Sequence, residues 1–87
     1  MARALTIQRT TVTPQERDRF HQRLRRKADY YAKANCRFWV FEEAGLPGAF
    51  LEFFEASDAA TLAKAHAGAP EPMILDPNRV YQEVELK

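Results

Sequence analysis

Residues 36–57 have the sequence CRFWVFEEAGLPGAFLEFFEAS and hold six of the ten aromatic residues of this 87-residue chain. Phe, Val and Trp dominate both halves of the segment, and such residues suit the pleated surface of a β-strand. Pro47 and Gly48 fit the two central positions of a type II turn, because proline presets φ and glycine accepts a positive φ. The segment therefore predicts a β-hairpin.

Both predicted strands are apolar on both faces, since successive side chains of a strand point in opposite directions. One face carries Cys36, Phe38, Val40, Phe50 and Phe54. The other face carries Trp39, Phe41, Leu51 and Phe53. A strand of this kind is covered on both sides. Helices of the same chain can cover one side, so the other side requires a second layer.

The composition is that of one globular domain spanning residues 1–87, with 46% hydrophobic and 29% charged residues. Cys36 is the only cysteine, which excludes an intrachain disulfide and suits a reducing compartment. No apolar run approaches the roughly 20 residues of a membrane span, and the first residues lack the apolar core of a signal peptide. We therefore expect a cytoplasmic protein that does not associate with a membrane.

The charges are segregated along the chain, although the net charge is only +1. Residues 1–37 hold ten Lys and Arg against three acids, and residues 38–87 hold three against nine, giving +7 and −6. A basic half can indicate a nucleic-acid-binding face. The small net charge instead favours internal complementarity, with a basic helix beside an acidic sheet or a partner subunit.

A strand over residues 4–12, with Leu5 and Ile7 on one face, and a helix over residues 14–34 are predicted before the hairpin. Thr13, Pro14 and Glu16 have the spacing of a capping box with proline at the first helical position, and Asn35 is the expected C-cap. The predicted inward stripe of the helix consists of Phe20, Leu24, Ala28 and Tyr31. The rest of its circumference is mainly basic: Arg17, Arg19, Arg23, Arg25, Arg26 and Lys27.

A second helix, capped by Ser57 or Asp58 and ended by Gly68, is predicted after the hairpin. Its expected inward stripe is Ala59, Leu62, Ala63 and His66. Residues 68–78 contain three prolines and predict a loop. Residues 79–86 predict a last strand, with Val80, Val84 and Leu86 inward and Tyr81, Glu83 and Glu85 outward.

The order strand–helix–strand–strand–helix–strand predicts an α+β fold of the ferredoxin-like βαββαβ type, with a four-stranded antiparallel sheet. Right-handed crossovers put both helices on one face of the sheet, so the other face is left bare. Burying side chains the size of Trp39 and Phe53 contributes roughly 1.5–3 kcal/mol each. We therefore expect a homodimer in which an identical subunit covers the bare face about a two-fold axis.

Three segments carry a resemblance to a known family: TIQRTTVTPQERDRFHQRL (residues 6–24), FLEFFEAS (residues 50–57) and DAATLAKAHA (residues 58–67). Together with the element order they resemble the dimeric α+β barrel superfamily, and within it the proteins similar to antibiotic-biosynthesis monooxygenases. The resemblance implies two sheets packed face to face and a pocket between each sheet and its helices. Some members oxidise phenols or hydroquinones without a cofactor, using an asparagine on the first strand. This chain has Gln8 there, and its only tryptophan is on the second strand, so no catalytic residue is carried over.

The expected function is the binding of a small aromatic or apolar molecule, with cofactor-independent oxygenation as a possible extension. His66, Tyr31, Trp39 and Phe53 are the predicted pocket residues, although a histidine in the last helical turn more often interacts with terminal carbonyls. No cofactor is expected, and the histidines and Cys36 lack the spacing of a metal site. Cys36 is interpreted as a small buried hydrophobe. Glu42, Glu43, Glu52 and Glu55 are interpreted as a solvated rim.

Two alternatives remain open at the level of sequence. One is a structural dimer with no ligand. The other is a module like an RNA-recognition motif, because residues 49–53 match the second half of that motif's third-strand signature. The first half of the signature is absent, and the expected glutamates on the sheet surface would repel phosphates. We therefore expect no specific nucleic-acid binding.

Overall fold

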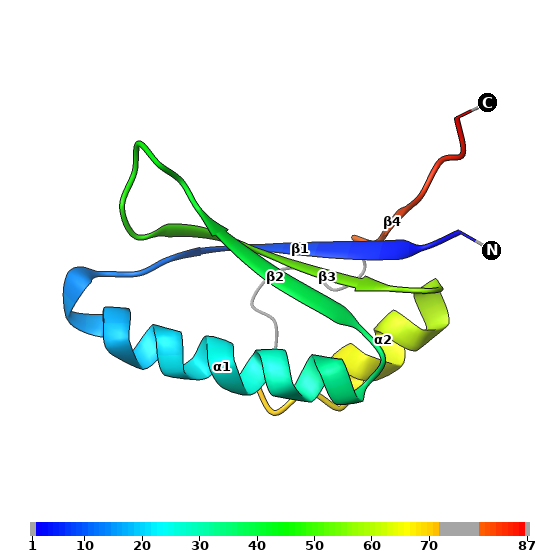
Figure 1. Cartoon of the computed structure of the whole chain (residues 1–87), viewed down its shortest axis with the longest axis horizontal. Helices are drawn as coiled ribbons and strands as arrows, with labels where there is room; N and C mark the ends of the chain where they lie inside the picture. The colour runs from blue at the N-terminus through cyan, green and yellow to red at the C-terminus, as the bar shows by residue number, and fades with distance from the viewer. Residues whose placement is uncertain (1, 72–78, 87) are drawn as a thin grey trace.

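The computed structural model describes residues 2–71 and 79–86, which form a sheet of four strands and two α-helices (Figure 1). In chain order the elements are β1 (Ala4–Thr11), a 3₁₀ turn (Pro14–Glu16), α1 (Arg17–Lys33), β2 (Arg37–Glu42), β3 (Ala49–Ala56), α2 (Ala59–Ala67) and β4 (Tyr81–Gln82). The spatial order of the strands is β2-β3-β1-β4, and every neighbouring pair is antiparallel. This arrangement confirms the α+β class and is compatible with a ferredoxin-like fold.

Both helices lie on one side of the sheet, and no described element covers the other side (Figure 1). The strand register places the two sets of hairpin side chains as the sequence predicts, with Trp39 opposite Phe53 and Phe41 opposite Leu51. We call the uncovered side the bare face. Its side chains, taken from the strand register, are Leu5, Ile7, Arg9, Arg37, Trp39, Phe41, Leu51, Phe53, Glu55 and Tyr81.

The predicted turn of the hairpin is confirmed. Ala49 N–H donates to the Leu46 carbonyl at 3.1 Å, which closes a four-residue turn around Pro47 and Gly48. Gly48 has φ = 93°, a conformation that strains a residue with a side chain. A Cβ at this position would also collide with the Val12 carbonyl oxygen, because β1 ends directly beside the turn.

Helix α1 begins differently from the prediction, and it ends one residue earlier, with Ala34 as the C-cap and the predicted cap Asn35 as the left-handed residue that follows it. The Glu16 N–H donates to the Thr13 carbonyl at 3.0 Å within the 3₁₀ turn, so it is not available to the Thr13 side chain, which makes no capping hydrogen bond. At the other end Asn35 has φ = 63°, and the Cys36 N–H donates to the Tyr31 carbonyl at 2.8 Å. These two features define a Schellman-type C-cap, which turns the chain directly into β2.

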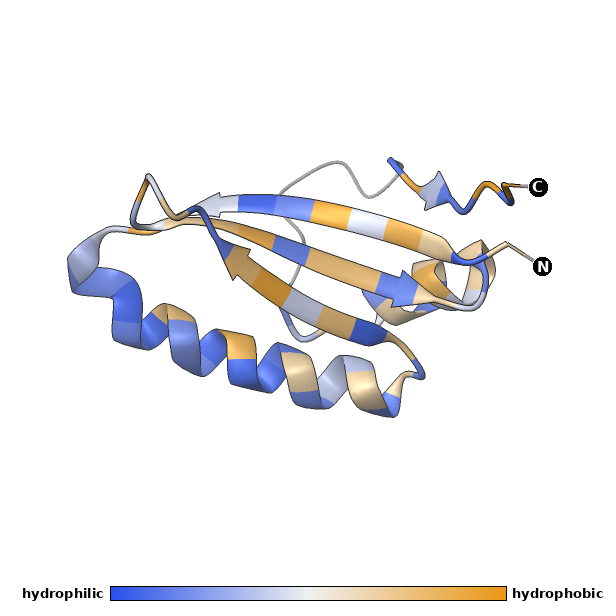
Figure 2. Cartoon of the chain, turned by 45° about the horizontal axis from the view of Figure 1, so that its top comes forward, coloured by the Kyte–Doolittle hydropathy of each residue, from blue (hydrophilic) through white to orange (hydrophobic). Residues whose placement is uncertain are grey.

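The core between the sheet and the helices contains two apolar clusters. One is built around Tyr31, Phe54 and Leu62, and the other consists of Phe20 and Phe50 with Val12. Between the clusters lie four polar side chains that we call the polar belt: Gln8 and Thr10 on β1, Lys27 on α1, and Glu52 on β3. Figure 2 shows hydrophilic positions interrupting the hydrophobic ones along the strands of the sheet.

The inward stripe of α1 differs from the prediction at one position. Ala28 is exposed, and Lys27 is buried in its place. Lys27 lies seven residues after Phe20 and four before Tyr31, so helical geometry puts it on the same face as both rings. Lys27 is buried because Glu52 on β3 supplies a buried acidic partner. The predicted stripe is chosen by hydropathy, which takes no account of such a partner.

Helix α2 begins as predicted at Asp58, whose carboxylate accepts a hydrogen bond from the Thr61 N–H at 2.7 Å. Its buried residues are Leu62 and Ala65. Ala63 was predicted inward but is exposed. The next inward residue after Leu62 is Ala65, three positions further along the helix.

The last strand is much shorter than predicted. β4 comprises only Tyr81 and Gln82, and Val80 packs against the Tyr31 cluster. Val84 and Leu86, predicted inward, are 75% and 92% exposed, since the chain leaves the sheet after pairing with the start of β1. Most of the predicted loop, residues 72–78, lies outside the described residues.

Candidate functional site

The centre of the polar belt is a carboxylate with no solvent exposure. Glu52 Oε1 accepts a hydrogen bond from Lys27 Nζ at 2.7 Å, and Glu52 Oε2 accepts one from the Thr10 hydroxyl at 3.0 Å. The Gln8 amide donates to the same Oε2 at 3.3 Å. The exposed fractions of the two charged side chains are 0% for Glu52 and 11% for Lys27. Burying a charge is tolerated only when it is paired and hydrogen-bonded, and this belt meets both conditions.

The polar belt forms one wall of a cavity of about 420 Å³ between α1 and the sheet. Phe20 and Arg23 also line the cavity, with the Arg23 guanidinium 5.5 Å from the centre of the Phe20 ring. The complete lining is Gln8, Thr10, Phe20, Arg23, Lys27, Glu52 and Glu71. The volume falls in the range of roughly 300–1,000 Å³ found for small-molecule sites, and the lining combines an aromatic ring with hydrogen-bonding groups.

Two cations of α1 near this cavity differ in their pairing. Arg26 pairs with the Glu71 carboxylate at 3.0 Å. Within residues 2–71 and 79–86, Arg23 forms no ion pair, and its only recorded contact is with the Phe20 ring. Arg23 is thus the cation best placed to interact with a polar or anionic group of a ligand in this cavity.

The four predicted pocket residues do not lie in one place. Tyr31 and His66 lie on the helix side of the sheet, where the Tyr31 hydroxyl is 2.8 Å from His66 Nδ1. Trp39 and Phe53 lie on the bare face, stacked with ring centres 6.0 Å apart. The sheet separates the two pairs, so a single pocket lined by all four is not formed.

His66 is held on both ring nitrogens. Its Nε2 atom is 2.7 Å from the Thr6 hydroxyl, its Nδ1 atom is hydrogen-bonded to Tyr31, and its ring packs edge-on against Phe54. Burial lowers the pKa of His66 below its ordinary value and raises the pKa of the Tyr31 hydroxyl. Both groups are therefore neutral near pH 7, and their geometry is that of a packed core contact.

The predicted rim of glutamates is wrong for Glu52, because its position on β3 shares the inward face with Phe50 and Phe54.

Glu42 and Glu43 are exposed. Glu42 accepts two hydrogen bonds from Arg17 and one from the Gly48 N–H, and these contacts lower the pKa of Glu42 to about 2. Glu55 pairs with Arg3 at 3.2 Å and lies 3.8 Å from Arg37 on the bare face.

Cys36 is buried, and burial raises the pKa of its thiol. A thiol held in the protonated form is a poor nucleophile. These observations agree with the interpretation of Cys36 as a small buried hydrophobe.

All ion pairs within the described ranges join a cation of residues 1–37 to an acid of residues 38–87. The pairs made by α1 are Arg17 with Glu42, Arg26 with Glu71 and Lys27 with Glu52. The basic and acidic halves of the chain therefore pair with each other within the molecule, as the interpretation of internal complementarity predicts.

The described ranges contain no group of three or more His, Cys, Asp or Glu side chains placed to hold a metal ion. Neither helix of these ranges is long and apolar enough to cross a membrane. Comparison with protein-family models, with curated proteins and with solved structures gave no match. The candidate site therefore rests on its geometry.

Proposed function

We propose that this chain binds a small, hydroxylated aromatic molecule in the cavity between α1 and the sheet, and that it acts as a homodimer. The observation that carries the binding proposal is the fully buried Glu52 carboxylate, held by Lys27, Thr10 and Gln8 at the wall of an open cavity. A purely structural core would gain as much or more stability from apolar residues at these positions. The buried pair holds Thr10 at the cavity, and the partly exposed side chains of Thr10 and Arg23 are suited to contact a ligand.

The cavity lining indicates the chemistry of the ligand. The Phe20 ring is only 2% exposed and is covered by the partly exposed Arg23 guanidinium, whose planar group can itself stack on the aromatic ring of a ligand. The partly exposed Thr10 hydroxyl already donates its hydrogen to Glu52 and can accept a hydrogen bond from a ligand hydroxyl, and Arg23 can donate to a second ligand oxygen. A phenol or hydroquinone satisfies both requirements.

The binding proposal is tested by thermal unfolding with a panel of phenols and hydroquinones at about 1 mM. Binding to the native state alone raises the melting temperature. The Thr10→Val and Arg23→Gln variants should each reduce this rise, while Arg19→Gln, an exposed residue of the same helix, should leave it unchanged. A panel that leaves the wild-type melting temperature unchanged, or an equal rise in all three variants, would contradict the proposal.

Oxygen consumption with any bound compound separates binding from oxygenation. Gln8 faces the cavity from the first strand, which is the strand that carries the asparagine in active proteins of the resembled family. A glutamine side chain is one methylene longer, and here its amide donates to Glu52. We therefore expect binding with no turnover, or with very slow turnover, and an oxygen electrode measures this directly.

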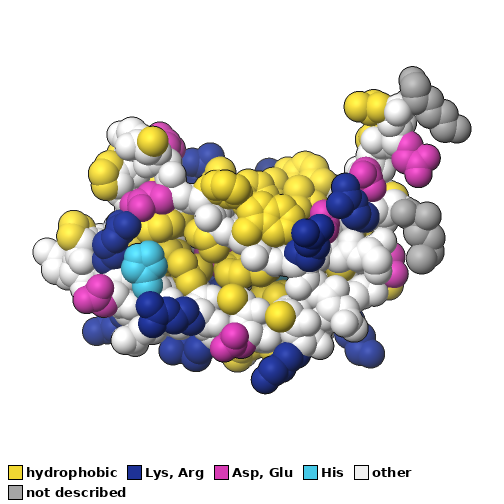
Figure 3. Space-filling view, viewed as in Figure 1, with side chains coloured by type: hydrophobic (Ala, Val, Ile, Leu, Met, Phe, Trp, Pro, Cys, Tyr) yellow, Lys and Arg dark blue, Asp and Glu magenta, His cyan; other side chains and the backbone are white. Residues whose placement is uncertain are grey.

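The homodimer proposal is supported by the bare face. Trp39 and Phe41 are exposed, and Leu5, Ile7, Leu51 and Phe53 are partly exposed beside them. Figure 3 shows hydrophobic side chains gathered over the sheet, with cations mostly along the helix below. A contiguous apolar surface of this kind is typical of an interaction site. An identical subunit related by a two-fold axis presents the same apolar surface and covers it without a further partner.

A specific observation favours RNA binding as a second candidate. The stacked Trp39 and Phe53 rings lie on the bare face, and Arg9 and Arg37 lie on the same face. Glu52, expected to repel phosphates from this face, lies on the opposite side of the sheet. Stacking rings beside arginines can hold single-stranded bases. This candidate and the homodimer require the same surface, so only one of them can occupy it at a time.

A further inference from the structure

Residues 83–86 have the alternation of a strand, but their apolar side chains belong to neither core cluster of the described residues. The Glu83 N–H donates to the Arg3 carbonyl at 2.8 Å, and beyond this bond the segment leaves β1. Val84 and Leu86, which are two residues apart and share one side of an extended chain, are 75% and 92% exposed. Figure 1 shows that the segment leaves the sheet on the side opposite the helices, which is the side of the bare face.

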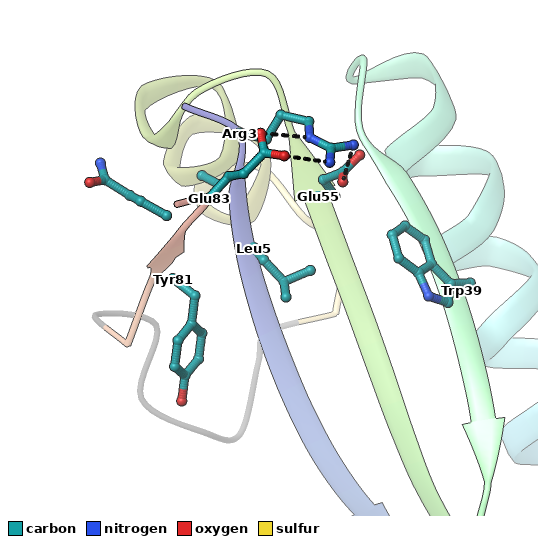
Figure 4. Close-up of a pocket in the computed structure, with 8 residues that line it drawn as sticks. Arg3, Leu5, Trp39, Glu55, Tyr81 and Glu83 are labelled. Carbon is teal, nitrogen blue, oxygen red and sulfur yellow. Dashed lines mark hydrogen bonds and ion pairs between the residues drawn. The ribbon is translucent and has the colours of Figure 1, made fainter. Parts of the chain in front are cut away.

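The bare face has a groove beside the start of this segment. Figure 4 shows Leu5 on β1 between Trp39 on β2 and Tyr81 on β4. Arg3 closes one end through ion pairs with Glu83 at 2.8 Å and Glu55 at 3.2 Å. The groove has a volume of about 230 Å³ and is lined by Arg3, Ala4, Leu5, Trp39, Glu55, Tyr81, Gln82 and Glu83. This volume is below the roughly 300 Å³ at which small-molecule sites begin, so side chains of another polypeptide are better suited to it.

We infer that residues 83–86 of each subunit cross to a second copy of the chain, where Val84 and Leu86 pack over Leu5 in the partner's groove. The inference rests on the homodimer proposed above and names the segment that the two copies exchange. Each copy has one groove and one such segment, so a two-fold axis satisfies both at once. The exchanged contact is then made twice in every dimer.

The segment cannot occupy the groove of its own chain without reversing direction. Tyr81, Gln82 and Glu83 already form one wall of that groove, and the next residues lead away from it. A segment that starts at the wall and points off the bare face is placed to meet a molecule seated on that face.

The charges of the segment and of the bare face are complementary. Residues 83–86 contain Glu83 and Glu85 and no cation. The bare face carries Arg37, whose nearest acid is Glu55 at 3.8 Å, and Arg9, which forms no ion pair in the part of the chain that the structure describes. An acidic segment seated over Leu5 can approach Arg37, which the register places opposite Glu55 beside Leu5, whereas Arg9 lies four residues further along β1.

The first test compares the dimer dissociation constant, measured by sedimentation over a dilution series, between two variants of the segment. Val84→Ser combined with Leu86→Ser should raise the dissociation constant by roughly tenfold or more, because buried apolar area is lost in two symmetric contacts. Glu85→Ser introduces a serine at the position between Val84 and Leu86, and it should change the dissociation constant by less than about threefold. An unchanged constant in the double variant overturns the exchange and leaves the homodimer standing.

The second test locates the segment by disulfide trapping in a Cys36→Ala background. Chains with Leu5→Cys and chains with Val84→Cys, carrying tags of different size, are refolded together and oxidised. A disulfide between the two kinds of chain is expected, because its Cα atoms must approach within about 7 Å. A chain carrying both cysteines that forms only an internal disulfide overturns the exchange, since the segment then folds onto its own sheet. A full chain that sediments as a monomer at micromolar concentration overturns the exchange and the homodimer together.

Discussion

Lys27 and Glu52 depend on each other for their burial. Their ion pair at 2.7 Å lies between two apolar clusters, and the other Glu52 oxygen is held by Thr10 and Gln8. Removing one charge leaves the other buried without a partner of opposite charge. The pair therefore behaves as one unit in the free energy of unfolding.

The first prediction concerns this coupling. Lys27→Met should lower the free energy of unfolding by about 3–5 kcal/mol, and adding Glu52→Gln should recover roughly 1–3 kcal/mol of the loss. Urea unfolding of the two single variants and the double variant measures both quantities. Arg26→Met, which breaks the largely exposed pair with Glu71 at 3.0 Å, is the matched control and should cost less than about 1 kcal/mol. Strictly additive effects of Lys27→Met and Glu52→Gln would show that the pair is not coupled.

The second prediction concerns the pH dependence that His66 gives to stability. Burial lowers the pKa of His66 in the folded chain below the value of 6.5 of the unfolded chain. As pH falls through 6.5 the unfolded chain takes up a proton before the folded chain does, so the free energy of unfolding decreases. Above this pH both states hold a neutral ring, and the contribution of His66 is fully present.

Unfolding midpoints in urea at pH 7.5 and 5.5 test this prediction. The wild-type chain should lose stability at the lower pH, and His66→Gln should reduce the loss. His21→Gln serves as the control, since His21 lies at the other end of the core against Phe20 and Phe50 and leaves the Thr6–His66–Tyr31 contact intact. A pH dependence that is the same in wild type and His66→Gln would exclude His66 as its source.

The candidate site was only partly predictable from single residues. The inward positions of Tyr31 and His66 follow from helical spacing and are confirmed. Glu52 and Lys27 were predicted outward because their charge was given more weight than their position. Strand alternation alone would place Glu52 with Phe50 and Phe54, and a partner seven residues after Phe20 on the neighbouring helix could then have been sought. No pattern in the sequence shows that a cavity lies beside the pair.

At the scale of the elements, the hairpin turn supplies the third prediction. Gly48 has φ = 93° and lies against the Val12 carbonyl, whereas a Cβ at Gly45 would meet nothing within 4 Å. Gly48→Ala should lower the free energy of unfolding by about 1–3 kcal/mol from backbone strain, with a further loss from the collision. Gly45→Ala, three residues earlier in the same loop, should change it by less than about 0.5 kcal/mol. Equal urea midpoints for the two variants would contradict the assigned turn.

The elements follow the sequence where local signals are strong. The hairpin, the Asp58 cap and the Asn35 exit from α1 each have a specific residue at a specific position, and all three are confirmed. The start of α1 differs because a 3₁₀ turn competes with the capping box for the same N–H group. The last strand differs because strand alternation predicts only that Val84 and Leu86 share a side. Alternation does not specify which surface these two side chains pack against.

At the scale of the whole molecule, the sheet separates two sites. The polar cavity lies beneath α1, and the apolar groove lies on the bare face. The sequence predicted both the two-sided hairpin and its helix-covered side, so the bare face follows from strand alternation together with right-handed crossovers. The proposed ligand binding and the proposed association therefore involve different surfaces and can be altered separately.

The fourth prediction is the oligomeric state. Sedimentation at micromolar concentration should give about twice the chain mass of 10.0 kDa. Trp39→Glu should produce a folded monomer, because Trp39 is 36% exposed on the bare face and lies outside both core clusters. The far-ultraviolet circular dichroism of the variant should match that of wild type. A Trp39→Glu variant that remains dimeric would show that the bare face is not the interface.

The fifth prediction separates the homodimer from RNA binding, which requires the same face. Most affinity for nucleic acid comes from contacts with phosphates, and Arg37 on the bare face already lies 3.8 Å from the Glu55 carboxylate, which leaves Arg9 as the cation of that face without an ion pair in the described ranges. Titration with single-stranded RNA at about 150 mM salt should therefore show no saturable binding tighter than the non-specific range of about 10⁻⁴–10⁻⁶ M. The Arg9→Gln and Arg37→Gln variants should then bind RNA no differently from Arg19→Gln on the helix. Nanomolar, sequence-dependent binding that is lost in Phe53→Ala and that dissociates the dimer would instead assign the bare face to RNA, since stacking on Trp39 and Phe53 requires both rings to be uncovered.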